Sequence, residues 1–270
     1  MKSNNSETEP VKPKMNLAPV FYTLAQVQFN PIAKMSDYIA PLQERLRRSG
    51  FPDFREEKQF ELTIRRLDES QPDVQPQQHL RWSFTNADRT EGYLLVSNTL
   101  VFHTTAYETF AEFLQKTIFG LKLVHEIVEL AYVERIGLRY LDAIVPLDGD
   151  TLPQYLNSTL LGLSAHPSGG LRHSFTETVT DIENATLVAR ALITEGGLAL
   201  SPDLFPLQLA LEKRFTEINC RHTVLDTDCF VANRSNFNVT NIETQFVNIH
   251  KIITNAFEIS VTDYARGRWA

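Results

Sequence analysis

Two arginines and a glycine alternate along one short segment, and their spacing is the clearest sign of chemistry in the chain. Within residues 132–142, three alternate positions are occupied by Arg135, Gly137 and Arg139. This alternation predicts a strand that carries all three residues on one face. Two guanidinium groups about 13 Å apart, with bare backbone between them, can hold a phosphate or carboxylate ligand through bidentate hydrogen bonds. The segment is therefore a candidate anion site.

A second interpretation places the same arginines in ion pairs within the sheet. Asp226 and Asp228 lie two residues apart on one predicted strand face, and Glu177 and Asp181 lie together on another. Cross-strand pairs between arginine and an acidic residue stabilise a sheet face without any ligand. Both interpretations stay open, and the candidate ligand-binding residues are Arg135, Gly137, Arg139, Asp226 and Asp228.

The usual patterns of catalysis and cofactor binding are missing from the sequence. No third acidic residue lies at a spacing that would complete a metal site with Asp226 and Asp228, so we expect no metal site. The seven histidines form no HxH or HExxH pair, and Cys220 lies near His222 without any further feature of a nucleophile. There is no GxSxG, GxGxxG or GxxxxGKS/T motif. We expect no cofactor and favour a non-enzymatic role, with the enzyme alternative left open.

Composition and charge exclude several classes of protein. The chain has 270 residues, of which 43% are hydrophobic, and this is enough to bury a large core. A net charge of −7 argues against nucleic acid as the partner, although arginines cluster at residues 45–48 and 266–268. No run reaches the ~18 apolar residues of a membrane span, and the polar start lacks the apolar core of a secretory signal. With two isolated cysteines that predict free thiols, the chain is expected to be cytoplasmic.

The periodicity of apolar residues predicts an α+β protein. Alternating patterns predict strands near residues 17–29, 60–64, 80–84, 93–102, 132–142, 175–179, 186–193 and 222–231. Residues 93–102 form either one strand or a hairpin bent at Ser97 and Asn98. Apolar residues three and four apart predict long helices near residues 107–130 and 242–257, and the first stripe is interpreted as core packing. The proline- and glutamine-rich residues 71–78 predict a loop.

The order of these elements repeats once along the chain. Each half reads as strand, short helix, three strands and long helix, which predicts two similar halves of mostly antiparallel sheet, each backed by a long helix. The predicted divisions are a flexible lead-in at residues 1–15, a first half at 16–130, a second half at 131–262 and a basic tail at 263–270.

The same segments carry a resemblance to a protein family. The sequence RIGLRY at residues 135–140, the stretch at 18–31, and Ile249-His250 followed by Ala256-Phe257 resemble an uncharacterised family of bacterial cytoplasmic proteins of about this length, scattered sporadically among genomes. The resemblance covers nearly the whole chain. It departs at Gln28, where the family often has a basic residue. It implies a bacterial, cytoplasmic, non-secreted protein and implies no known activity.

Two hypotheses about function follow. The first is a non-enzymatic binding or regulatory protein that acts with a partner protein, or as a homo-oligomer, in a bacterial accessory or defence-type system such as phage defence. The second is a sensor or enzyme for a nucleotide-like anion held by Arg135 and Arg139. The environment of the two guanidinium groups distinguishes them. Burial in pairs with Asp226 and Asp228 makes the arginines structural, whereas an open pocket leaves them available to a ligand.

Overall fold

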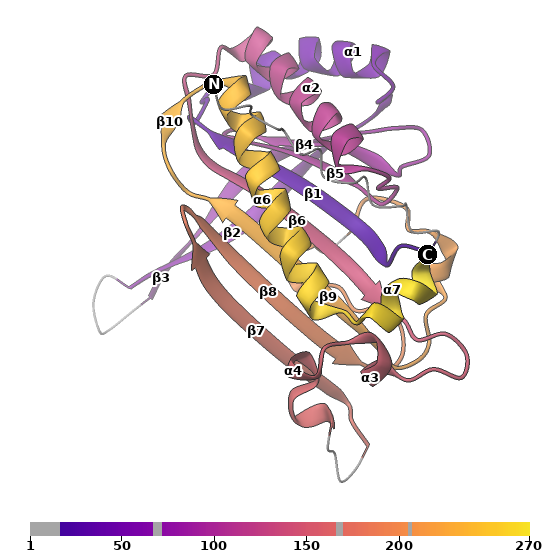
Figure 1. The fold of residues 1–270 in the computed structure, drawn as a ribbon. Coiled ribbons are helices and arrows are strands. Elements are labelled where there is room, and N and C mark those ends of the chain that lie inside the picture. The colour runs from indigo at the N-terminus through magenta and orange to yellow at the C-terminus, as the bar shows by residue number, and fades with distance from the viewer. Residues whose placement is uncertain (1–16, 67–71, 166–169, 205–206) are drawn as a thin grey trace, which may run out of the picture.

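The protein folds around one large antiparallel β-sheet, with its longer helices packed on one face (Figure 1). The computed structural model describes residues 17–66, 72–165, 170–204 and 207–270. All strand pairings among these residues are antiparallel, which confirms the predicted α+β class and antiparallel sheet. The lead-in predicted at residues 1–15 lies outside the described residues.

The described residues form ten strands and seven helices. The strands are β1 (Val20–Phe29), β2 (Asp53–Arg66), β3 (Pro72–Thr85), β4 (Glu91–Val96), β5 (Thr99–Thr104), β6 (Tyr132–Ile144), β7 (His173–Ile182), β8 (Ala185–Thr194), β9 (His222–Val231) and β10 (Ser235–Asn236). The helices are α1 (Ile39–Arg48), α2 (Phe110–Val128), α3 (Leu152–Tyr155), α4 (Ser158–Leu161), α5 (Lys213–Thr216), α6 (Val239–Ser260) and α7 (Asp263–Trp269). Residues 93–102 are therefore the hairpin β4–β5, one of the two predicted alternatives. None of the helices in the described part of the chain has the length and apolar character that crossing a membrane requires.

Strand β1 pairs with β6 in the middle of the sheet. The order across the sheet is β2-β3-β4-β5-β1-β6-β9-β8-β7, and β10 pairs with β6 at one end. Val27 of β1 lies opposite Ile136 of β6, and both side chains belong to the core beneath the helices. Side chains alternate between the two faces of a strand, so the neighbouring Gln26 and Gly137 belong to the other face. The centre of the sheet thus has one apolar face and one polar face.

Helices α2 and α6 cover the apolar face of the sheet. Helix α2 begins after Thr109, whose side chain accepts a hydrogen bond from the Glu112 N–H, and ends at Glu129, where φ is 56°. Helix α6 packs against β6, β9 and α2. The apolar stripe predicted for α2 is confirmed as core packing by the burial of Phe113, Ile118, Leu121, Val124 and Val128.

Strands β2 and β3 are longer than the periodicity predicts, and the loop expected at residues 71–78 is wrong for residues 72–78. These residues belong to β3 and pair with β2, and Pro76 lies opposite Leu62. Proline lacks an N–H donor, but a strand with one unpaired edge tolerates this loss. Strand β4 pairs with β3 only at residues 82–85. The rest of β2 and β3 therefore extends beyond the sheet as a two-stranded arm (Figure 1).

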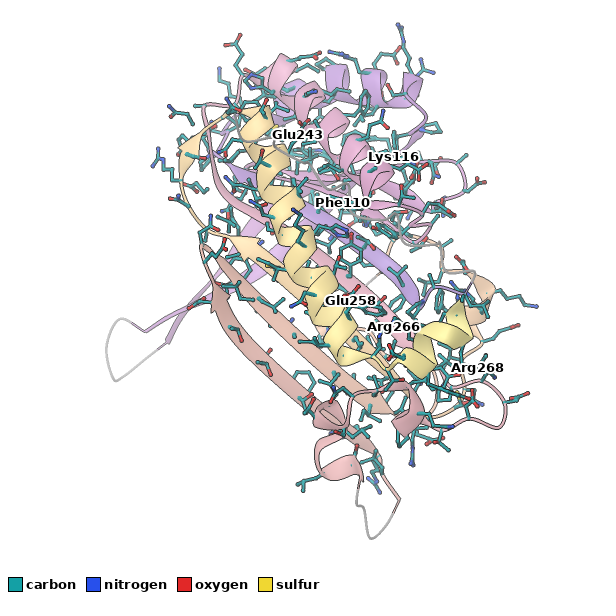
Figure 2. The ribbon with its side chains drawn as sticks, in the orientation of Figure 1. Phe110, Lys116, Glu243, Glu258, Arg266 and Arg268 are labelled. Atoms are coloured by element: carbon teal, nitrogen blue, oxygen red, sulfur yellow. The ribbon has the colours of Figure 1, made fainter. Side chains whose placement is uncertain are left out.

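The basic C-terminal residues form helix α7 and pack against the body of the protein. Trp269 is 4% exposed and contacts the rings of Tyr155 and Phe257. The Arg268 Nε donates a hydrogen bond to Asp150 Oδ2 at 2.9 Å, and Figure 2 shows this arginine on α7. The segment predicted as a basic tail is thus held by an aromatic anchor and an ion pair.

Helix α2 contains a glycine whose replacement should destabilise the protein. A Cβ on Gly120 would lie 2.2 Å from Cε1 of Tyr93, a fully buried side chain that has no room to move aside. Gly120→Ala should lower the free energy of unfolding by about 1–3 kcal/mol, as overpacking of a core does. Urea denaturation measures this change.

Gly267 in α7 is the matched control, because a Cβ there has no atom within 4 Å. Gly267→Ala should raise the free energy of unfolding by up to ~1 kcal/mol, the ordinary difference between the two residues within a helix. If Gly120→Ala also stabilised the protein, the packing of α2 on Tyr93 would be contradicted.

Candidate functional site

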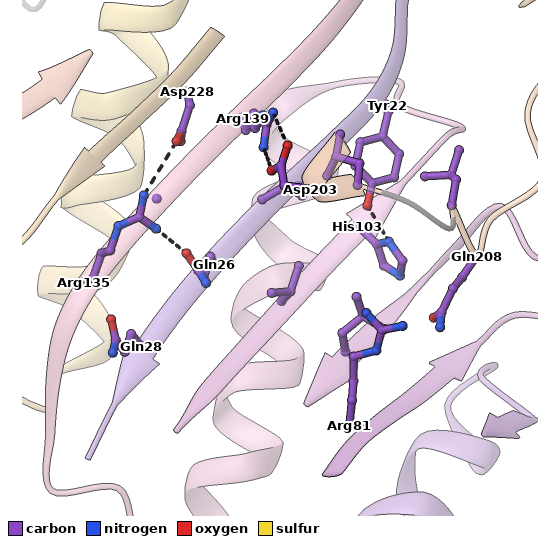
Figure 3. Close-up of a pocket in the computed structure, with 16 residues that line it drawn as sticks. Tyr22, Gln26, Gln28, Arg81, His103, Arg135, Arg139, Asp203, Gln208 and Asp228 are labelled. Carbon is purple, nitrogen blue, oxygen red and sulfur yellow. Dashed lines mark hydrogen bonds and ion pairs between the residues drawn. The ribbon is translucent and has the colours of Figure 1, made fainter. Parts of the chain in front are cut away.

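A pocket of about 470 Å³ lies on the face of the sheet opposite α2 and α6. We call it the sheet-face pocket (Figure 3). Strands β1 and β6 form its floor, and β3, β4, β5 and β9 contribute residues at its sides. The irregular segment between β8 and β9 adds Asp203, Leu204, Leu207 and Gln208. The volume is in the range typical of sites for small molecules.

The structure brings all five predicted site residues to this region. Arg135, Gly137 and Arg139 of β6 and Asp228 of β9 line the pocket, while Asp226 is buried beside it and hydrogen-bonds to Arg139. The predicted ion pairs are confirmed, since Arg139 pairs with Asp226 and Arg135 pairs with Asp228. The two pairs differ in strength and exposure, and this difference decides which arginine can contact a ligand.

Arg139 is buried and forms ion pairs with the buried Asp226 and with the exposed Asp203. Its Nε and Nη2 donate to the two carboxylate oxygens of Asp226 at 2.6 and 2.7 Å, and its Nη1 donates to Asp203 Oδ2 at 2.5 Å. Ser201 Oγ donates to the same Asp226 at 2.8 Å. Burial acts to lower the pKa of Arg139, but the hydrogen bonds and charges of the two aspartates together raise it. With most of its five N–H groups engaged, Arg139 is a structural residue.

Arg135 is held more loosely and faces the pocket. Its Nη1 donates to Gln26 Oε1, and its Nη2 lies 3.7 Å from Asp228 Oδ2, beyond hydrogen-bond distance (Figure 3). The guanidinium lies 4.2 Å from the centroid of the Phe230 ring, and its side chain is 25% exposed. A Cβ on Gly137 would come within 2.9 Å of Arg135 Nη1, so the glycine leaves space for this group. Arg135 therefore keeps N–H groups available to a ligand.

The opposite end of the pocket contains polar residues that the sequence analysis did not identify. His103 is 1% exposed, and its Nδ1 lies 2.8 Å from the Tyr22 hydroxyl. Glu57 accepts hydrogen bonds from Arg81 Nη2 and, at 2.7 Å, from Gln208 Nε2. At this end of the pocket, three buried atoms have no hydrogen-bond partner among the described residues: Arg81 Nε, His103 Nε2 and Gln208 Oε1. The three atoms are unsatisfied in this conformation, and a bound molecule reaches them only when the side chains that cover them move aside.

The three atoms define which chemical groups fit this end of the pocket. Arg81 Nε donates a hydrogen bond, Gln208 Oε1 accepts one, and His103 Nε2 does either according to its tautomer. Burial, aided by the charge of Arg81, lowers the pKa of His103 to about 3, so the imidazole is neutral at pH 7. A planar group with adjacent acceptor and donor atoms, such as an amide or a nucleobase edge, matches this pattern. Within the described part of the chain, no three His, Cys, Asp or Glu side chains group to hold a metal ion.

The Arg139–Asp226 pair should matter for stability. Arg139→Met removes the bidentate partner of Asp226, which is 3% exposed, and leaves it only the longer ion pair with Arg190 at 3.6 Å. The free energy of unfolding should fall by about 3–5 kcal/mol, the usual effect of removing one member of a buried ion pair. Urea denaturation at pH 7 measures the change.

Two further variants control this prediction. Arg139→Met combined with Asp226→Leu should recover most of the lost stability, because no buried charge is then left unpaired. Arg135→Gln should cost less than about 1 kcal/mol, because this arginine makes a longer and more exposed ion pair. Equal losses for Arg139→Met and Arg135→Gln would contradict the distinction between the two arginines.

Neither a protein-family model nor a curated protein matches this chain. The resemblance of residues 135–140 to a bacterial family stays a prediction from the sequence.

Proposed function

We propose that this protein is a non-enzymatic binding or regulatory component whose sheet-face pocket recognises a nucleotide-like ligand. The observation that carries the proposal is the set of three buried polar atoms without partners, Arg81 Nε, His103 Nε2 and Gln208 Oε1. Each buried polar group without a hydrogen bond costs on the order of 1–3 kcal/mol. A ligand that satisfies all three recovers this free energy on binding, and all three residues line one pocket.

The anionic end of the ligand is assigned to Arg135 alone. Arg139 has its donors occupied by Asp226 and Asp203, which revises the hypothesis of two arginines gripping one anion. In the strand register Arg135 lies opposite Gln28, and His103 lies opposite Leu24, about 13 Å away along β1. The pocket therefore separates an anion-binding end from an end that suits a planar hydrogen-bonding group.

Two apolar side chains, from β4 and β5, lie between these two ends, beside the polar Gln26. Val101 and Leu94 are paired residues of β5 and β4, and Val101 lies opposite Gln26, midway between the two ends. Both line the pocket. Sites for small molecules usually combine apolar side chains with a few placed polar groups. A nucleotide, with a phosphate at one end and a base at the other, has matching chemistry.

The β2–β3 arm supports the involvement of a partner protein. Residues 58–66 and 72–80 pair with each other and extend about 30 Å by strand rise. A two-stranded hairpin by itself is marginally stable in water, so contact with another protein would stabilise the arm. We propose that the arm contacts a partner or a second copy of this chain. The setting, a bacterial accessory or defence-type system, is proposed from the sequence alone.

We also propose that the chain consists of two related halves, residues 16–130 and 131–262. The strand order supports this division, because β5 flanks β1 on one side as β9 flanks β6 on the other. Each half begins with a central strand, and α2 and α6 occupy corresponding places near the ends of the two halves. The ligand pocket spans the junction, since both central strands contribute to its floor.

Ligand binding can be tested with thermal melting and calorimetry on the full chain. Nucleoside monophosphates, the corresponding nucleosides and inorganic phosphate are the probes. At least one nucleotide should raise the melting temperature, and Arg135→Gln should weaken its binding about tenfold or more, the effect of losing about 1.4 kcal/mol. Gln208→Leu should weaken both nucleotide and nucleoside, because it alters the opposite end of the pocket.

Arg45→Gln is the matched control, because this half-exposed arginine on α1 pairs with Glu126 away from the pocket. It should leave binding unchanged. The proposed ligand class is wrong if no nucleotide binds the wild-type protein, or if Arg135→Gln and Arg45→Gln bind equally well.

The role of the arm is tested by shortening it. Replacement of residues 59–79 by Asn-Gly joins Lys58 to Leu80 through a two-residue hairpin turn. The variant should keep its sheet-face pocket and its nucleotide response. It should lose either self-association in sedimentation or a partner captured by the full-length chain from its native host. If neither association differs between the two proteins, the arm is not a contact surface.

A further inference from the structure

A buried carboxylate lies on the helix-covered face of the sheet, on the side opposite the sheet-face pocket. Asp142, near the end of β6, is 6% exposed, and its side chain forms no hydrogen bond or ion pair with any described residue. Burial alone raises the pKa of Asp142 to about 7. Asp226 is similarly buried but is paired with Arg139. Asp142 is therefore an acidic group whose charge the described protein leaves uncompensated.

Asp142 opens onto a small pocket of about 150 Å³, which we call the Asp142 pocket. Its walls are mainly aromatic and apolar, and they include Tyr107, Tyr140, His250, Ile253 and Phe257. The volume equals that of about five water molecules in the liquid. The pocket therefore accepts a group of a few non-hydrogen atoms.

The other polar groups of the Asp142 pocket interact with one another. The Tyr140 hydroxyl donates to the Tyr107 hydroxyl at 3.1 Å and lies 3.3 Å from His250 Nδ1. His250 Nε2 lies 3.5 Å from Thr254 Oγ1. Asp142 is therefore the one described group of the lining that gains a charge near neutral pH, since burial lowers the pKa of His250 to about 4 and keeps it neutral there.

The combination of an unpaired carboxylate with aromatic walls is suited to a cation. An anion would be repelled by Asp142, and a neutral apolar molecule would leave the carboxylate unpaired. An ammonium group gains both an ion pair with the carboxylate and attraction to the faces of aromatic rings. We propose that the Asp142 pocket binds an organic ammonium group, of a small free amine or at the end of a lysine side chain, with Asp142 as its counter-ion.

The proposal implies a defined pH dependence. The titratable groups facing Asp142 are Tyr107, Tyr140 and His250, from the loop before α2, from β6 and from α6. Burial raises the pKa of Tyr107 to about 12 and raises the pKa of Tyr140, and it lowers the pKa of His250 to about 4. All three are therefore uncharged between about pH 5 and 9. Only Asp142 changes charge in this interval, and an ammonium group binds its ionised form.

The raised pKa of Asp142 also makes the stability of the protein depend on pH when no amine is present. The folded state holds the Asp142 proton up to about pH 7, whereas the unfolded chain releases it near the ordinary aspartate pKa of 3.8. The unfolded state binds fewer protons in this interval, so this group makes stability fall as pH rises from about 4 to 7 and then adds no further change. Asp142→Asn should remove this contribution and raise the stability at pH 8.

The binding test uses n-butylammonium chloride and isothermal calorimetry on the full chain at pH 5.5 and 8.5. The wild-type protein should bind the amine at pH 8.5 and bind it at least tenfold more weakly at pH 5.5, where Asp142 is protonated. Asp142→Asn, which keeps the shape of the side chain, should remain folded and lose binding. Asp88→Asn, a change at an exposed aspartate, should bind as the wild type does.

Additional probes distinguish the chemistry and the source of the ammonium group. n-Butanol and butyrate should bind far more weakly than n-butylammonium. N-acetyl-lysine-N-methylamide should bind at least as tightly as n-butylammonium if the source is a lysine side chain, and more weakly if it is a free amine. The proposal is overturned if no amine binds at pH 8.5, if Asp142→Asn binds like the wild type, if affinity is equal at both pH values, or if n-butanol binds equally well.

Discussion

The antiparallel pairing of β1 with β6 determines where every functional side chain of this protein lies. Val27 opposite Ile136 and Ala25 opposite Leu138 are buried beneath the helices, so their burial holds the register. Side chains alternate along a strand, and a slip of one residue would exchange the faces of the whole strand. It would place Arg139 under the helices and expose the apolar core. Because that exchange is so unfavourable, Arg135, Gly137 and Arg139 stay on the face that carries the sheet-face pocket.

The two arginines of β6 show how position within a pocket changes the role of one residue type. Arg139 lies where the segment between β8 and β9 covers the sheet, and its side chain is 9% exposed. Its guanidinium joins Asp226 of β9 to Asp203 of that segment, so it holds one wall of the pocket in place. Arg135, four residues away, is 25% exposed and has the open part of the pocket beside it. Arg139 therefore stabilises the wall of the pocket, and Arg135 has N–H groups that can contact a ligand.

Two buried carboxylates, Asp226 and Asp142, lie on opposite faces of the sheet and differ in whether a cation compensates their charge. Both are nearly inaccessible to water, but among the described residues only Asp226 has a cationic partner. A buried charge without a partner is unfavourable and shifts its protonation equilibrium, as burial does for Asp142. Proteins concentrate such unfavourable groups at functional sites. Both proposed sites share this character, since the sheet-face pocket also contains buried polar atoms without partners.

The sequence by itself determined the α+β class, the apolar stripe of α2, and the common face of Arg135, Gly137 and Arg139, because these features depend on periodicity within a single segment. It also offered the correct partners for the arginines as one of two alternatives. Only the tertiary structure decided that Arg139 is buried and Arg135 is not, and that His103 and Gln208 share their pocket. It also decided that residues 72–78 continue a strand in spite of their prolines. The physical reason is that these outcomes depend on which distant segments pack together. Burial, ion pairing and the shape of a pocket depend on contacts between distant segments, so the periodicity within one segment does not predict them.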